Sequence, residues 1–280
     1  MRWVAALLLA IPLLAATSAW AASPSKHYWL PIAQSNLIVS GQILLPPEKQ
    51  GATDEWIQVR IRVNHVLKGI SGADEITVRY FASEEPYAVS HKYLLALDKK
   101  DVLVFLVSAT TEGKPDWYFL GENGVDLVNP QSVSEIRNEV ARQQAVLRAW
   151  QPGPETKYTA NVQRLVDQAV DAKEEQNAFR DLEGVGMGGV PALIEIMDDR
   201  RPLPIPAISL RNPPGAFEGL RHYGPKTVVD ALAAILNQIT FYDFGFIYSG
   251  GSDEERARAV AGWRVYSDIL RNHPAMLPPK

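Results

Sequence analysis

Residues 56–69, WIQVRIRVNHVLKG, decide the fold of the first half of the chain. From Ile57 to Asn64 the odd-numbered positions carry β-branched side chains and the even-numbered positions carry polar ones. Successive side chains of a strand point to opposite faces, so this period of two predicts a strand with one buried face and one face in water. His65 continues the parity of the buried face and is therefore expected to be a buried, hydrogen-bonded histidine.

The segments around this strand are also typical of strands. EITVRYF (75–81) alternates in the same way, whereas LIVSGQIL (37–44) and DVLVFLV (101–107) contain continuous apolar runs, as expected of strands covered on both faces. WYFLGENG (117–124) runs into a turn-rich tetrapeptide, with a further apolar stretch at 125–128. Five or six short strands within residues 36–130 predict a small antiparallel β-barrel.

These stretches, with the Val-Leu-Lys-Gly turn at residues 66–69, resemble the OB-like barrels related to the tissue inhibitors of metalloproteinases. Such barrels recur in exported bacterial proteins of unknown role, so the resemblance implies a fold rather than an activity. In the inhibitors, an N-terminal cysteine and its disulfides hold the protease-binding edge. This chain has no cysteine, and metalloproteinase inhibition is therefore not expected of it.

From residue 132 onward the apolar period is helical. Ser132 and Glu135 have the spacing of a capping box at a helix start, and Gln151-Pro-Gly-Pro154 is expected to end that helix. LEGVGMGGVPALIEIMDD (182–199) is similar to one HEAT-type helix pair, although a solenoid needs about three repeats or more. We expect an α+β chain in which a helix and linker (131–154) join the barrel to an irregular all-α, HEAT-like domain (155–280).

Two unusual segments flank the predicted helix at 225–239. Residues 200–225 contain six prolines, which exclude a helix or a central strand. Residues 241–248, FYDFGFIY, carry five aromatic side chains. The two segments lie at opposite ends of the helix and meet only if one of them folds back along it. A second capping box, Ser252 with Glu255, predicts the start of the last helix.

Composition limits the classes of function. The chain has 280 residues, 28 Lys and Arg against 32 Asp and Glu, and a formal net charge of −4. It therefore has no overall positive charge to attract nucleic acid or an anionic membrane. The absence of cysteine excludes disulfides, thiolate metal sites and a cysteine nucleophile.

Residues 1–21 have the form of a signal peptide. Arg2 is followed by an apolar run over 3–16 and by Ala19-Trp-Ala21, which predicts cleavage after Ala21. The apolar run is shorter than the roughly 20 residues that span a bilayer. We expect a periplasmic or secreted protein with no membrane span after cleavage, in which a short segment (22–35) precedes the barrel.

Motifs for catalysis and cofactors are weak. Gly184-x-Gly186-x-x-Gly189 matches the dinucleotide fingerprint by letter, but its helical surroundings favour an interhelical turn. The histidines lack the spacing of metal ligands, so no metal or other cofactor is expected. No Gly-x-Ser-x-Gly motif of a nucleophilic serine occurs. A pair of carboxylates separated in the sequence is compatible with the chain, and the nearest candidates are Glu218, Asp230 and Asp243.

The remaining signal is a set of basic and aromatic side chains in the helical half, near the two unusual segments. Together they would form a groove that accepts a sugar, a peptide or an anionic ligand. Its residues are Arg211, Arg221, His222, Phe241, Tyr242, Asp243, Phe244 and Tyr248. The alternative is that the aromatic side chains cap the helical core and the proline-rich loop covers an apolar seam.

Three functions stay open at this point. The first is a protein-interaction or ligand-binding module without catalysis, whose partner is an envelope protein or a glycan. The second is a cell-envelope hydrolase acting on glycan or peptide near residues 241–248, and the third is an inhibitor whose barrel edge blocks a partner enzyme. A hydrolase needs two titratable groups converging in a concave pocket, whereas a binding module needs only an apolar or aromatic surface.

Overall fold

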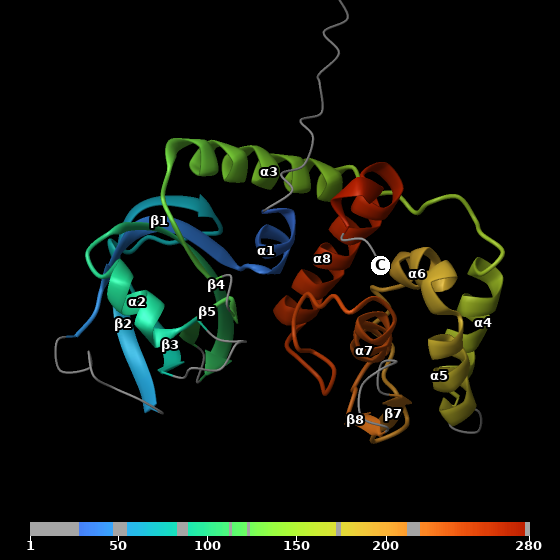
Figure 1. Cartoon of the computed structure of the whole chain (residues 1–280). Coiled ribbons are helices and arrows are strands. Elements are labelled where there is room, and N and C mark those ends of the chain that lie inside the picture. Colours follow the sequence, from blue (N-terminus) through green and yellow to red (C-terminus); the bar gives the residue numbers. More distant parts are fainter. Residues whose placement is uncertain are drawn as a thin grey trace, which may run out of the picture.

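The structure is a computed structural model that describes residues 28–46, 55–82, 89–111, 114–121, 124–171, 175–211 and 219–277. A β-barrel and a helical region lie side by side, with α1 between them and α3 running across both (Figure 1). The predicted signal peptide, Glu218 and the middle of the proline-rich loop lie outside the described residues. The predicted fold class, a barrel followed by a helical region, is confirmed.

The barrel is a closed sheet of five strands. They are β1 (Leu37–Leu44), β2 (Glu55–Lys68), β3 (Glu75–Ala82), β4 (Asp101–Thr111) and β5 (Lys114–Phe119). Their order is β1-β2-β3-β5-β4, and a β1–β4 pairing closes the ring. All these pairs are antiparallel except β3–β5, which is parallel. A short β6 (Val125–Leu127) pairs antiparallel with β4, and α2 (His91–Leu97) lies between β3 and β4 in the chain.

His65 is exposed, so the prediction of a buried histidine is wrong. In the β1–β2 pairing Gly41 lies opposite Val63 and Ser40 opposite His65, which leaves Asn64 as an extra residue. Such a bulge moves the side chains that follow it to the other face of the strand, here as far as a second irregularity between Val66 and Lys68. Accordingly Ile61 lies in the barrel core, whereas Leu67, of the same parity, lies in a cluster on the outside of the barrel.

That outer cluster is covered by α1 (Trp29–Gln34) and α3 (Pro130–Arg148). Ile38 of β1 and Phe105 of β4 pack there against Ile136 of α3, which confirms that these strands are covered on both faces. The helix α3 begins earlier than the predicted capping box. Asn129 Oδ1 accepts a hydrogen bond from the Ser132 backbone N–H (2.8 Å), and Pro130 occupies the first turn, so these two residues fix the start.

The helical region surrounds one core. Its elements are α4 (Thr159–Ala169), α5 (Glu175–Gly184), α6 (Gly186–Glu195), β7 (Ile208–Arg211), β8 (Leu220–Tyr223), α7 (Val228–Thr240), α8 (Asp253–Asn272) and a final 3₁₀ turn (Pro274–Met276). The glycine-rich stretch is an interhelical turn, as predicted, because α5 ends and α6 begins within it. The proline-rich loop contains the antiparallel β7–β8 pair, which the proline count did not predict.

The last two helices begin at carboxylate caps. Asp230 accepts hydrogen bonds from the backbone N–H groups of Lys226 and Thr227, both at 3.0 Å, so α7 begins after the predicted position at Pro225. The predicted capping box of α8 is confirmed: Ser252 N–H donates to Glu255 (2.7 Å) and Glu255 N–H donates to the Ser252 hydroxyl (3.2 Å).

Candidate functional site

The barrel and the helical region are joined through α1 and α3. The ring of Trp29 lies 5.8 Å from that of Tyr242, and the Trp29 carbonyl accepts a hydrogen bond from Gln143 of α3 (2.8 Å). Arg142 of α3 pairs with Asp268 of α8 (2.5 Å). These buried contacts fix the barrel against α8, and the space left between them is part of the folded structure.

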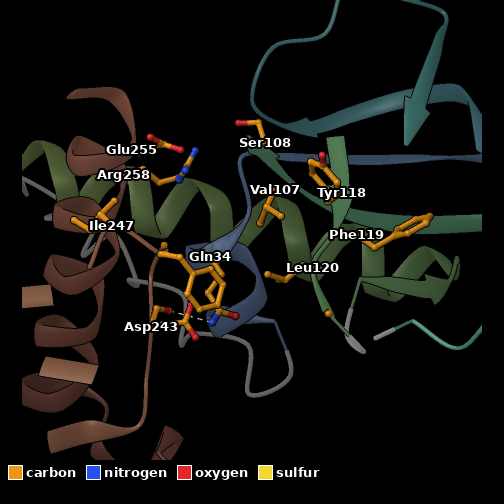
Figure 2. A pocket seen from close by; sticks show the side chains of 13 residues that line it. Gln34, Val107, Ser108, Tyr118, Phe119, Leu120, Asp243, Ile247, Glu255 and Arg258 are labelled. Atoms are coloured by element: carbon orange, nitrogen blue, oxygen red, sulfur yellow. Dashed lines mark hydrogen bonds between the residues drawn. The ribbon is translucent and has the colours of Figure 1, made fainter. Parts of the chain in front are cut away.

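A cavity of about 400 Å³ opens between the ends of β4 and β5 and the segment that leads into α8. Figure 2 shows side chains from both sides around it. We call it the barrel–helix cleft. Its apolar lining includes Val107, Phe119, Leu120, Phe246 and Ile247, and its polar lining includes Gln34, Ser108, Asp243, Glu255 and Arg258.

A second cavity of about 360 Å³ lies beside the first, between α1, the end of β2, α3 and α8. We call it the Lys68 cavity. Arg258 lines both cavities and therefore stands where they adjoin. Both volumes fall within the range of small-molecule sites, about 300–1,000 Å³, and both linings are mainly apolar with a few polar groups, as in such sites.

Two carboxyl groups of the barrel–helix cleft have pKa values shifted in opposite directions. Burial raises the pKa of Asp243, and a hydrogen bond from the Gly245 backbone partly offsets this shift. Hydrogen bonding from the Ser252 backbone lowers the pKa of Glu255. The Asp243 carbonyl also accepts a hydrogen bond from Gln34 Nε2 (3.0 Å), drawn in Figure 2, so α1 holds this segment in place.

Two cationic groups, Lys68 and Arg258, line the Lys68 cavity. Lys68 Nζ donates a hydrogen bond to the Ile32 carbonyl of α1. Burial, and then the nearby Arg258 charge, lower the pKa of Lys68 to about 8. Burial also lowers the pKa of Arg258, against the attraction of Glu255 and Glu254. Both changes favour the neutral forms, as expected of like charges brought together away from water.

The structure separates the predicted aromatic residues into two groups. Phe244 and Tyr248 are buried in the helical core: the Phe244 ring meets Trp263 at 4.9 Å, and the Tyr248 ring meets Tyr223 at 5.2 Å. Tyr242 is half-buried against the same core. Phe241 is exposed at the end of α7. Of the predicted site residues, only Asp243 is among the described residues that line the barrel–helix cleft.

The predicted basic residues lie on the β7–β8 hairpin. Arg211 lines a smaller cavity of about 210 Å³, and its backbone N–H donates to Glu183 (3.2 Å). His222 shares a hydrogen bond with Ser209 (2.9 Å), and Arg221 interacts electrostatically with Tyr248. Gly224 N–H donates to the Ser249 hydroxyl (3.2 Å), so the two predicted segments do meet, because residues 241–251 fold back along α7.

Asp230, one of the predicted catalytic carboxylates, is fully buried and has four donors. In addition to the two backbone N–H groups, Arg256 Nε and Nη2 donate to it at 2.8 and 2.9 Å. It is not among the described residues that line the barrel–helix cleft or the Lys68 cavity. Its role in the structure is to hold the start of α7 against α8.

Three aromatic side chains, those of Trp56, Phe81 and Tyr118, form a cluster on the outside of the barrel, and Tyr118 also lines the cleft. The exposed ring of Trp56 lies 5.6 Å from that of Phe81 and 6.1 Å from that of Tyr118. They stand on β2, β3 and β5, so this cluster continues the apolar lining of the cleft onto the surface.

Comparison with protein-family models, with curated proteins and with solved structures finds no match. Among the described residues no group of three or more His, Asp or Glu side chains is placed to hold a metal ion. In the same part of the chain, no helix is long and apolar enough to cross a membrane.

Proposed function

We propose that the chain is an exported ligand-binding protein without catalytic activity, and that its ligand lies in the barrel–helix cleft. The observation that carries this proposal is the cleft itself, a cavity of about 400 Å³ with a mainly apolar lining at the junction of two folded units. Small-molecule sites have this composition and occur preferentially at such junctions. Export to the periplasm or beyond is supported by residues 1–21.

The carboxyl groups of the cleft favour binding over catalysis. Glu255 Oε2 already accepts hydrogen bonds from the Ser252 backbone and hydroxyl groups (2.7 and 2.9 Å). Protonating Glu255 would weaken the capping box at the start of α8. The Asp243 carboxyl group also has a donor, the Gly245 N–H, and Gln34 holds the backbone carbonyl of the same residue.

The test is to fill the cleft. Val107→Trp adds a large side chain to the lining, whereas Val66→Trp places the same side chain on an exposed position of β2. The chain beginning at Ala22 is used, because the apolar run over 3–16 would itself bind an apolar probe. We expect phenylnaphthylamine, a neutral fluorescent probe, to bind the parent chain and Val66→Trp equally, and Val107→Trp at least tenfold more weakly.

Circular dichroism establishes that both variants retain the parent fold. If the parent chain leaves the probe unbound, or if Val107→Trp binds it as well as the parent does, the cleft is not the ligand site.

A second candidate function is a hydrolase acting on envelope glycan or peptide. One observation favours it: Asp243 and Glu255 line one cavity and have pKa values shifted in opposite directions, as acid and base pairs do. The test measures soluble fragments released from purified cell-wall material by the parent chain and by Asp243→Asn. Ligand binding without catalysis predicts no release by either. Release by the parent that Asp243→Asn abolishes would establish hydrolysis instead.

A further inference from the structure

The charged side chains of the Lys68 cavity are predominantly cationic. Among the described residues that line it, the charged ones are Lys68, Arg258 and Glu254. Glu254 is exposed, whereas Lys68 and Arg258 are half-buried. They come from different parts of the fold, Lys68 from the end of β2 and Arg258 from the second turn of α8. Packing the barrel against α8 therefore brings two cations together.

Neither cation forms a salt bridge with a described carboxylate, although Glu255 and Glu254 attract Arg258 at longer range. Lys68 donates to a neutral carbonyl, that of Ile32, and no described carboxylate lies within 4.0 Å of Lys68 or Arg258. Two other arginines near α8 differ in this respect. Arg142 pairs with both Glu139 (2.8 Å) and Asp268 (2.5 Å), and Arg256 pairs with Asp230 (2.8 Å).

Two like charges without a salt bridge are unfavourable in a partly dry cavity. Burial, and then the Arg258 charge, lower the pKa of Lys68 accordingly. An anion placed between them would accept hydrogen bonds from both and would remove their repulsion. Lys68 is charged below about pH 8, and an arginine keeps its charge in proteins, so the attraction for an anion is present at neutral pH.

We propose that the ligand of the barrel–helix cleft is a small amphipathic anion whose carboxylate or phosphate head group binds between Lys68 and Arg258. This inference rests on the proposed function, because it names the ligand class of the same site. The apolar body lies in the cleft beside Leu120, Phe246 and Ile247. The reverse orientation is disfavoured, because Asp243 and Glu255 would then face the head group.

The test is competition with bound phenylnaphthylamine at pH 7. The competitors are decanoate, which has a head group and an apolar body, decanol, which lacks the charge, and inorganic phosphate, which lacks the body. We expect decanoate to displace the probe at least tenfold more effectively than decanol, and phosphate not to displace it.

Arg258→Gln and Lys68→Gln should each remove most of the preference for decanoate without changing the affinity for decanol. Arg62→Gln, at an exposed position of β2, is the matched control and should behave as the parent.

A second measurement is independent of the probe. The NMR titration of the Lys68 side chain should give a pKa of about 8 in the free protein and a higher value when decanoate is bound. Three results would overturn the proposal of an anionic, amphipathic ligand while leaving the cleft as a binding site. They are equal competition by decanoate and decanol, an unchanged preference for decanoate in Arg258→Gln, and displacement of the probe by phosphate alone. Failure of the parent to bind the probe at all would instead count against the proposed function.

Discussion

Replacing Phe244 with alanine is expected to lower the free energy of unfolding by about 3–5 kcal/mol, the usual loss for a fully buried aromatic side chain. The Phe244 ring is 1% exposed and packs edge-on against Trp263 of α8. It lies so close to Gly262 that a Cβ there would collide with it. The vacated space has rigid walls, because the neighbouring rings of Trp263 and Tyr266 pack on each other. Urea denaturation followed by circular dichroism measures the loss.

Phe246→Ala is the matched control from the same segment. The Phe246 side chain is 84% exposed, so its removal should change the free energy of unfolding by no more than about 0.5 kcal/mol. Because Phe246 lines the cleft, the same variant should bind phenylnaphthylamine more weakly. A Phe244→Ala chain as stable as the parent would show that this segment is not part of the helical core.

Asp230→Ala should destabilise the chain by a similar amount, about 3–5 kcal/mol, the cost of leaving one partner of a buried ion pair without the other. Arg256 would lose its two hydrogen bonds to the carboxylate, and the N–H groups of Lys226 and Thr227 would lose their acceptor. The change therefore affects both the start of α7 and its contact with α8. The measurement is again the free energy of unfolding in urea.

Asp253→Ala is the control for this prediction, since Asp253 also lies near Arg256 (3.5 Å) but is 95% exposed. An exposed pair contributes about 0–1 kcal/mol, so the expected loss is small. Equal losses for Asp230→Ala and Asp253→Ala would contradict the assignment of Asp230 as a buried structural anchor, and would return it to the set of catalytic candidates.

The strands and the two-part architecture could be predicted because their signals are local. Alternation over residues 57–63 is a property of one strand, and it holds until the extra residue at Asn64. The bulge could not be predicted, because it depends on the pairing of β2 with β1. For the same reason the short helix α1 could not be predicted. It has no extended apolar period, and tertiary contacts through Trp29 hold it in place.

The candidate site was harder to predict because it is built from distant segments. In the aromatic segment, Phe244 was a predicted site residue and Phe246 was not. In the structure Phe244 is buried in the helical core, whereas Phe246 lines the cleft. Which ring faces inward depends on the space above Gly262. Lys68 and Arg258 had no motif to connect them, because their proximity is created by packing the barrel against α8.

The most direct test of the ligand site is to locate bound decanoate by intermolecular nuclear Overhauser effects to methyl groups of the chain beginning at Ala22. If the ligand lies in the barrel–helix cleft, its methylene protons should give signals to Leu120 and Ile247, which line the cleft from opposite sides (Figure 2). Leu220, an exposed residue of the β7–β8 hairpin beside Arg211, should give none. Signals to Leu220 without signals to Leu120 or Ile247 would contradict this account and place the ligand at the hairpin.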